Sequence, residues 1–360
     1  MATVETKSKS EALKESLFLQ HKNGCLTADD GFLREAETFC EGYKDFLNKG
    51  KTERLAAAQA AQLCEEHGFV PFDRNEAYAP GDKVYVLHRN KALIAAVIGT
   101  EPIANGVNLV AAHIDSPRID LKPNPLYEDA ELALCKTHYY GGIKKYQWTA
   151  LPLSLHGVVV KAGGETLEAH LGDQEGEPRF VINDLLPHLA TEQVKRTLNE
   201  GVKGEELNVL VGSYPFRDDK GSELIKLNIL KLLHEKYGMV EKDFLSAELE
   251  LVPAHAACDV GFDRSMVGGY GQDDRVCAYP GLMALLHTDT PKRTAVTILA
   301  DREEIGSEGN TGLNSSFLPY FIDDLAAVQG TKGRHVLSRS VCLSADVNAA
   351  FDPTFPGCSG

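Results

Sequence analysis

The sequence has 360 residues, of which 43% are hydrophobic and 25% are charged, and its formal net charge is −15. This is the composition of a globular protein that is long enough for two domains. The negative charge argues against binding to nucleic acid or to an anionic membrane surface. No apolar run approaches the ~20 residues of a membrane span, and the polar start has no signal-peptide core. None of the eight cysteines forms a C-x-x-C pair, so we expect free thiols in a reducing cytoplasm rather than a thiolate zinc site.

Two helices and three strands are predicted in the first third of the chain. Aromatic and apolar residues recur at helical spacing from about residue 30 to 47, and an Ala-rich helix is predicted from 53 to 67, where Gly68 ends it. Strand-like apolar runs follow at 83–88, 92–98 and 107–112. This order of elements indicates an α/β domain.

The composition changes between about residues 119 and 245. This segment has Pro-rich and Gly-rich stretches, β-like runs such as 156–161, and one strong helix from about 222 to 237. Buried-strand runs return afterwards, at 246–252, 295–300 and 341–345. We therefore expect one α/β domain, formed by residues 1–118 and 246–360, that is interrupted by an inserted β-rich domain formed by residues 119–245.

Acidic or histidine residues directly follow three of the predicted buried strands. They are His113 and Asp115, then the cluster Asp301, Arg302, Glu303 and Glu304, and finally Asp346. A fourth cluster, Asp273 and Asp274, follows a Gly-rich stretch. Ligands of open α/β sheets bind beyond the carboxyl ends of the strands, so we expect these side chains to converge on one site.

This combination of side chains suits a metal site. A neutral imidazole with carboxylates is the usual donor set of catalytic zinc, and carboxylate-rich sites also hold manganese or cobalt. One aspartate can bridge two cations, which lie ~3.5–4 Å apart in two-metal hydrolases. Of the adjacent Glu303 and Glu304, one would bind metal and the other would accept a proton from water.

Each motif taken alone also has a purely structural interpretation. An H-x-D sequence after a strand is often ordinary structure, and a pair of glutamates is common on protein surfaces. Asp273 or Asp274 can begin a helix, and Asp346 can cap a turn. The repetition of the same pattern after several strands is what favours the metal site.

Four segments carry distinctive motifs, and they occur in a fixed order. They are A-A-H-I-D-S-P-R-I-D-L-K-P-N-P-L at 111–126, G-Q-D-D-R-V-C-A at 271–278, D-R-E-E-I-G-S-E at 301–308 and S-A-D-V at 344–347. Together they closely resemble the metal motifs of the aspartyl aminopeptidase and vacuolar aminopeptidase I family of dinuclear metallo-aminopeptidases. The resemblance covers most of the chain and implies a three-layer α/β metallopeptidase domain with an inserted, β-rich dimerisation domain.

The resemblance also implies a ligand set for two divalent ions. His113, Asp273 and Asp346 would hold one ion, Asp273 would bridge to the second, and Glu304 would bind that second ion. Zinc is the expected metal, with manganese and cobalt as alternatives.

Three further roles follow from the resemblance. Glu303 would be the general base, and Asp115 would orient the histidine ligand through its other ring nitrogen. His188, in L-P-H-L-A at 186–190, would contact substrate in a neighbouring subunit, although an ordinary surface histidine is an equal alternative. The expected assembly is a homo-oligomer built from dimers, with a dodecamer as one form of it.

One ligand of the family has no counterpart in this sequence. The family has a final histidine ligand well downstream of the Asp346 motif, whereas only 14 residues follow Asp346 here and none is His. We therefore expect a chain that lacks the family's C-terminal part. The second ion would keep only Asp273 and Glu304 and would bind more weakly.

The expected function is the release of N-terminal amino acids from peptide substrates. One alternative is a carboxypeptidase or deacylase with a similar metal site, and another is a truncated relative with weak or no activity. Peptides blocked at one end or the other discriminate between the first two functions.

Overall fold

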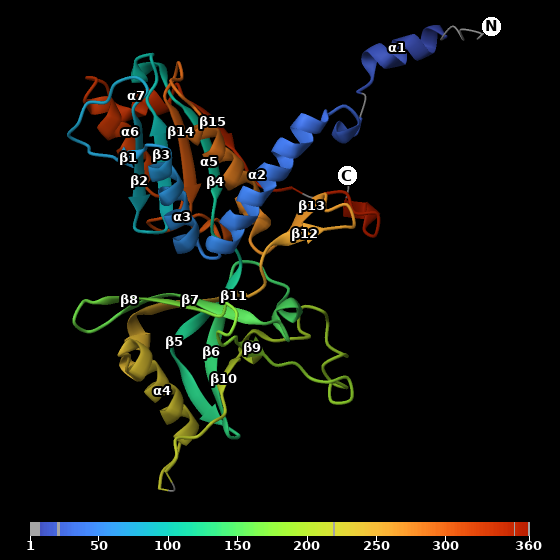
Figure 1. Ribbon diagram of the computed structural model, residues 1–360, viewed down its shortest axis with the longest axis vertical. Coiled ribbons are helices and arrows are strands. Elements are labelled where there is room, and N and C mark those ends of the chain that lie inside the picture. The colour runs from blue at the N-terminus through green and yellow to red at the C-terminus, as the bar shows by residue number, and fades with distance from the viewer. Residues whose placement is uncertain (1–7, 20–21, 219, 349, 359–360) are drawn as a thin grey trace. The chain divides into compact units, whose positions relative to one another are not determined.

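The computed structural model describes residues 8–19, 22–218, 220–348 and 350–358 (Figure 1). The chain divides into two compact units, residues 1–43 and 44–360. In the first unit, helix α1 (Lys9–Leu17) begins with a capping box between Ser8 and Glu11. No helix in the described part of the chain is long and apolar enough to cross a membrane.

A six-stranded mixed sheet in the second unit has the order β1-β2-β3-β14-β4-β15. Its strands are β1 (Val70–Pro71), β2 (Lys83–His88), β3 (Ala92–Val97), β14 (Ala295–Ala300), β4 (Asn108–His113) and β15 (Val341–Ser344). β14 and β15 both pair with β4 in parallel. The carboxyl ends of these three strands therefore lie at the same end of the sheet, its carboxyl edge.

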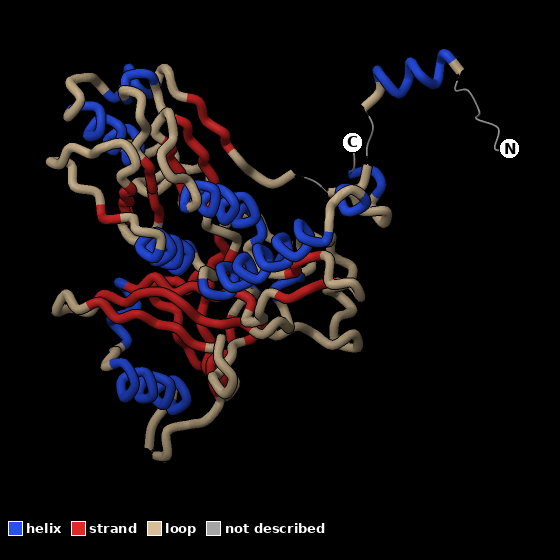
Figure 2. The backbone as a smooth tube through the Cα atoms, turned by 45° about the horizontal axis from the view of Figure 1, so that its top comes forward, coloured by secondary structure: helices blue, strands red, loops and turns tan. Residues whose placement is uncertain are grey.

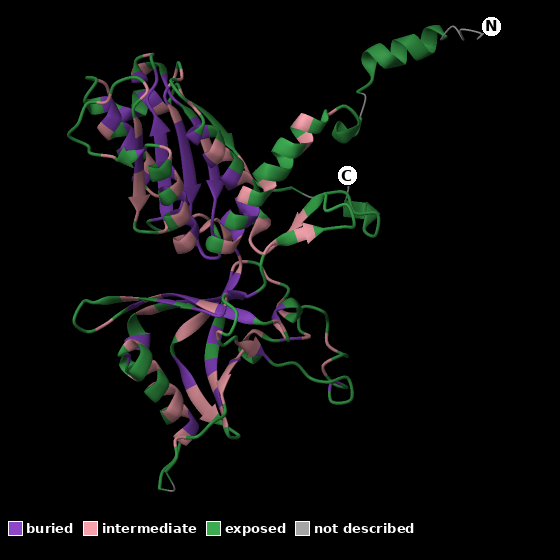
Figure 3. Ribbon diagram, viewed as in Figure 1, coloured by how far each residue is buried: buried purple, intermediate pink, exposed green. Residues whose placement is uncertain are grey.

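Many residues of the six-stranded sheet are buried, and Figure 3 shows them in purple. Helices α6 (Phe317–Ala327) and α7 (Gly333–Leu337) contribute to a core cluster that includes Ile94 and Ala96 of β3. Helices α3 (Glu53–Glu66) and α5 (Gln272–Leu286) also contact strands of this sheet. Every residue of β3 is buried, as expected for a strand covered on both faces.

The predicted elements of this region agree with the structure to within about two residues at each end. The predicted helices correspond to α2 (Asp30–Lys49) and α3, and the predicted runs 83–88, 92–98, 107–112 and 295–300 correspond to β2, β3, β4 and β14. The run 341–345 corresponds to β15, but the prediction that it is buried is wrong. Val341 and Leu343 are 61% and 64% exposed. The reason is that β15 is the edge strand and pairs with β4 alone.

A separate seven-stranded antiparallel sheet is formed by residues between Arg118 and Pro253, in the order β8-β7-β11-β5-β6-β10-β9. Its strands are β5 (Arg118–Asp129), β6 (Leu132–Tyr140), β7 (Leu153–Val160), β8 (Thr166–Leu171), β9 (Val181–Ile182), β10 (Val209–Gly212) and β11 (Ala247–Pro253). Helix α4 (Leu224–Tyr237) runs beside this sheet (Figure 2) and confirms the predicted helix at 222–237. A two-stranded sheet of β12 (Cys258–Val260) and β13 (Met266–Gly268) follows. The domain boundaries at 118 and 246 stay a prediction.

Candidate metal centre

Three of the predicted ligands lie together at the carboxyl edge of the six-stranded sheet. One ligand atom from each of His113, Asp273 and Asp346 lies within 4.8 Å of the other two. His113 ends β4, Asp346 lies two residues beyond β15, and Asp273 lies in the first turn of α5. The parallel pairing of β4 and β15 brings the first two side chains to the same edge.

His113 is held so that one ring nitrogen faces the open space and the other faces the protein. Its Nδ1 lies 3.2 Å from Oδ1 of Asp115 and 3.0 Å from the Asp115 carbonyl oxygen. Its Nε2 lies 3.2 Å from Oδ1 of Asp273 and 3.7 Å from Oε2 of Glu303. Burial lowers the pKa of His113, but the hydrogen bond and charge of Asp115, with the charges of Asp274 and Glu303, raise it to about 9. Because Nδ1 faces Asp115, Nε2 is the nitrogen that would bind a cation after loss of its proton, and Asp115 fixes the ring.

Asp115 is the buried carboxylate that connects the parts of this site. It is fully buried, and besides contacting His113 it accepts hydrogen bonds from the backbone N–H groups of Glu303 and Glu304, at 3.2 Å each. The hydroxyl of Tyr140 donates to its Oδ2 at 2.8 Å. Burial raises the pKa of Asp115, yet the hydrogen bonds from His113 and Tyr140 keep it below the ordinary value. One carboxylate therefore positions the histidine and both glutamates.

Glu303 and Glu304 lie in a short 3₁₀ turn, Glu303–Ile305, directly after β14. Burial and the negative charge of Asp273 raise the pKa of Glu304 to about 7. Gly141 packs against Glu304, because a Cβ at Gly141 would lie 3.1 Å from the Glu304 Cβ. The Gly141 φ of +74° is also one that favours glycine. The tight approach of Gly141 limits where the Glu304 carboxylate can lie.

The Gly-rich stretch before Asp273 shapes the entry to α5. Gly271 has φ +80°, and a Cβ there would lie 2.1 Å from Nη1 of Arg275, so only glycine fits. The Ser116 hydroxyl donates to the Asp273 carbonyl oxygen at 2.9 Å. The fully buried Asp274 accepts from the His113 backbone N–H at 3.3 Å, and burial raises its pKa to about 6. Asp274 thus supports the backbone of the candidate histidine ligand, while Asp273 faces the open site.

Tyr140 is a site residue that the sequence motifs did not reveal. It is the last residue of β6, in the seven-stranded sheet, and it reaches Asp115 beside the six-stranded sheet. Burial and the charge of Asp115 raise its pKa, so the hydroxyl keeps its proton and acts as a donor. The guanidinium of Arg118 lies 3.8 Å from the centre of the Tyr140 ring. The only local signal was the glycine pair after the aromatic residues in Y-Y-G-G.

Arg118 belongs to a buried network of charges behind Tyr140. Its guanidinium pairs with Glu53 of α3 at 3.2 Å, with Asp120 at 2.8 Å and with Glu250 of β11 at 3.4 Å. Burial opposes ionisation of Glu53, but Arg118 and Lys91 lower its pKa to about 2. Burial and the nearby Glu53 charge raise the pKa of Glu250 well above its ordinary value. The Arg118 guanidinium therefore stabilises the interior side of the site, between α3 and the seven-stranded sheet.

Among the described residues, His188 has no hydrogen bond or ion pair with the other predicted site residues. It is exposed, in the segment between β9 and β10, and it is not in the candidate metal group found among the described residues. A cleft of about 450 Å³ opens beside Asp273, between Ser116, Lys144 and Trp148. This cleft offers room for a substrate next to the candidate ligands.

Comparisons with known proteins agree with this geometry. Residues 46–359 match the model of the family described as aminopeptidase I zinc metalloprotease (M18). A Clostridium acetobutylicum protein described as "Probable M18 family aminopeptidase 1" is 45% identical over 352 residues, which cover 96% of this chain and 76% of that protein. The crystal structure of an M18 aminopeptidase from Thermotoga maritima superposes with a TM-score of 0.89 at 42% identity, over 94% of this chain and 74% of that one.

A more distant structure shares the fold. The mApe1 dodecamer of S. cerevisiae has a TM-score of 0.71 at 22% identity and covers 90% of this chain and 74% of that chain. The resemblance inferred from the four motifs is thereby confirmed at the level of the family. The chain belongs to the M18 family of zinc metallo-aminopeptidases, which are hydrolases that act on peptides.

Proposed function

We propose that the carboxyl edge of the six-stranded sheet is a two-metal aminopeptidase site. His113, Asp273 and Asp346 would hold one divalent ion, and Asp273 and Glu304 would hold the second. The observation that carries this proposal is the cluster of one imidazole nitrogen and two carboxylate oxygens within 4.8 Å. Zinc is the metal of the family, and manganese and cobalt suit the same donors.

The proposed donors fit a small divalent ion. Donor atoms bound to one tetrahedral zinc at ~2.0–2.2 Å lie about 3.3–3.6 Å from each other, so the present spacing needs only small side-chain rotations. Asp273 and Asp346 are exposed and can make such rotations, whereas His113 is buried and fixed by Asp115. A tetrahedral ion held by the His113 nitrogen and the two carboxylates would keep its fourth coordination position open to substrate.

The remaining side chains have proposed roles in moving a proton. A divalent ion at this position supplies Lewis-acid chemistry, which polarises the scissile carbonyl group and acidifies a water. Glu303 faces the same space, with Oε2 3.7 Å from Nε2 of His113, and would accept the proton as general base. Asp115 would keep the base in place through the Glu303 backbone N–H.

Peptides with free and with acetylated amino termini test the proposed function directly. The zinc-loaded 360-residue protein should hydrolyse only the free peptide. Glu303→Gln should lower kcat by about 10²–10⁴-fold without loss of zinc, whereas the exposed Glu308→Gln should leave it unchanged. Equal cleavage of both peptides would favour the carboxypeptidase or deacylase alternative, and near-normal kcat in Glu303→Gln would remove Glu303 from the mechanism.

We further propose that residues 1–118 and 246–360 form a three-layer catalytic domain, of which residues 247–253 (β11) add a strand to the seven-stranded sheet. Residues 119–245 would mediate dimerisation within a larger homo-oligomer. The separate antiparallel sheet and the dodecamer of a distant relative support this proposal. His188, which is exposed, would then reach the site of a neighbouring subunit.

Complementation between two inactive variants tests the role of His188. His188→Ala and Glu303→Gln should each be impaired alone. Mixed oligomers should recover part of the activity, because a Glu303→Gln subunit supplies His188 to a neighbour with an intact Glu303. Co-assembly without recovery would show that His188 does not act across the interface.

A further inference from the structure

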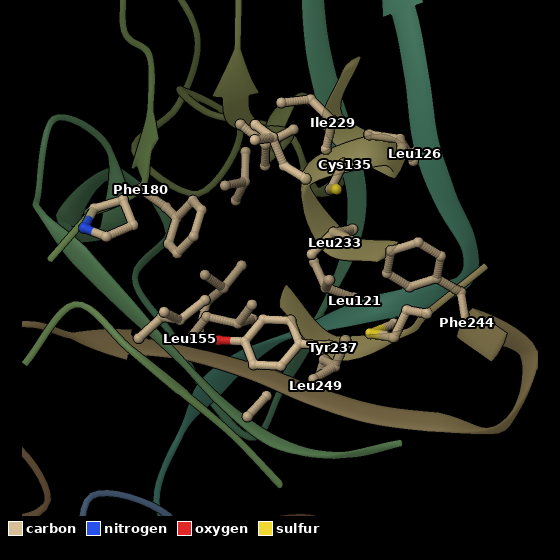
Figure 4. A pocket seen from close by; sticks show the side chains of 18 of the residues that line it. Leu121, Leu126, Cys135, Leu155, Phe180, Ile229, Leu233, Tyr237, Phe244 and Leu249 are labelled. Atoms are coloured by element: carbon tan, nitrogen blue, oxygen red, sulfur yellow. The ribbon is translucent and has the colours of Figure 1, made fainter. Parts of the chain in front are cut away.

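An apolar cavity of about 250 Å³ lies away from the metal centre, between α4 and the seven-stranded sheet (Figure 4). Side chains from β5, β7, β10, β11 and α4 line it. Nearly all of these side chains are aliphatic or aromatic, and the figure shows them converging on a common space. The residues that catalyse peptide hydrolysis in the proposal above do not line this cavity.

The cavity divides the core of the seven-stranded sheet. One cluster of buried residues includes Phe244 and Met239, and another includes Trp148 and Leu251. Leu155, like Leu121 and Val211, packs against both clusters and is only partly buried. Protein interiors are normally close-packed, with few voids larger than a water molecule. An apolar space of this size can therefore accept an apolar guest.

The cavity opens to solvent between α4 and the loop after β8. Three of its lining residues are exposed, namely Pro178 on the loop and Leu232 and Lys236 on α4. The interior residues are apolar, so the polar end of a guest would have to lie at this mouth. The shape therefore suits a molecule with one apolar tail and one polar head.

Two polar groups lie at the last turn of α4. The Lys236 ammonium lies 5.2 Å from the centre of the Tyr237 ring. Among the described residues, Lys236 has no ion pair and the Tyr237 hydroxyl has no hydrogen bond. The nearby carboxylate of Glu177 accepts hydrogen bonds from the backbone N–H groups of Gln174 and Gly172, which lower its pKa, and the charge of Lys236 contributes further. Glu177 is thus held by its own loop, and the Lys236 ammonium remains available at the mouth, whereas the Tyr237 hydroxyl points toward Leu155 (Figure 4).

We propose that this cavity binds a single-chain aliphatic carboxylate. The tail would lie among Leu155, Leu233 and Phe180, and the carboxylate would accept a hydrogen bond from Lys236. A cavity of ~150 Å³ accommodates the six carbons of benzene, so the present volume accommodates about ten carbons. Decanoate is therefore the probe of matching length.

Calorimetric titration of the full 360-residue protein tests the proposal. Decanoate should bind at least about tenfold more tightly than decylammonium, which has the same tail length and the opposite charge. Lys236→Glu should reverse this preference, and Lys242→Glu, the same charge change at an exposed residue outside the lining, should not. Affinity should rise with tail length up to about ten carbons and then level off.

Three results would overturn the proposal. Equal affinity for decanoate and decylammonium would show that the mouth does not select a carboxylate. The same loss in Lys242→Glu as in Lys236→Glu would show a general charge effect. Affinity that keeps rising beyond about ten carbons would show adsorption to an open surface or a site shared with another chain.

Discussion

The metal centre and the cavity under α4 use interior space in opposite ways. At the metal centre the fully buried Asp115 contacts four different groups, so its position is fixed from several directions. Around the cavity, Leu155 and Leu233 face inward and remain only partly covered. A buried charge without partners is costly, whereas a loosely packed apolar group loses only part of its contacts. The side chains of the metal centre are therefore held in one geometry, whereas those around the cavity can adjust to an occupant.

The largest effect is expected at Arg118, in the buried network of charges behind Tyr140. Arg118→Ala leaves Glu53 and Glu250 buried with only Lys91 nearby. Removing one partner of a buried ion pair costs about 3–5 kcal/mol, so urea unfolding should show a loss of this size. The control is Arg196→Ala, at the more exposed pair with Glu206, which should cost about 1 kcal/mol or less. Equal losses in the two variants would show that the buried network contributes no more than a surface pair.

A smaller effect is expected from the contacts of Asp115. Asp115→Ala removes the group that fixes the His113 ring and should weaken zinc binding about 10–100-fold. Tyr140→Phe removes one hydrogen bond to Asp115 and keeps the ring over Arg118, so it should lower kcat about tenfold with less effect on zinc affinity. Calorimetry and steady-state kinetics measure the two quantities. Unchanged kcat in Tyr140→Phe would show that the hydrogen bond from the seven-stranded sheet to Asp115 does not contribute to catalysis.

A third effect depends on pH and concerns Asp173, which follows β8 of the seven-stranded sheet. Asp173 pairs with His156 at 3.1 Å and with Lys51 at 2.7 Å. Burial raises the pKa of Asp173, but hydrogen bonds from both partners hold it below the ordinary value of 3.8. Because the folded pKa is depressed, the stabilisation is complete above about pH 4 and is lost as pH falls further.

Urea unfolding over a pH series measures this dependence. Asp173→Asn should cost about 1–3 kcal/mol near neutral pH, and the difference from wild type should shrink at acid pH. Asp129→Asn, at the exposed end of β5, should show no difference at any pH. The difference in unfolding free energy between Asp173→Asn and wild type should not grow as pH falls. Such growth would contradict the assignment of the lowered Asp173 pKa to His156 and Lys51.

The sequence predicted local and repeated features well and long-range packing poorly. The runs that became β3 and β14 were recognisable because buried strands are almost continuously apolar. The long strand β5 was not predicted, because K-P-N-P interrupts its pattern and a register shift lies between Leu121 and Leu126. Tyr140 was missed because its contact with Asp115 joins two sheets. The exposure of β15 depends on its place at the sheet edge, which no single segment encodes.

The central claim is that His113, Asp273 and Asp346 form the metal site, and zinc binding by the 360-residue protein tests it most directly. Equilibrium dialysis should give about one tightly held ion per chain and a weaker second one, because only one group of three donors occurs among the described residues. Asp346→Asn should lose the tight ion, and the exposed Asp352→Asn should keep it. Two tightly held ions in the wild type, or full retention in Asp346→Asn, would contradict this account.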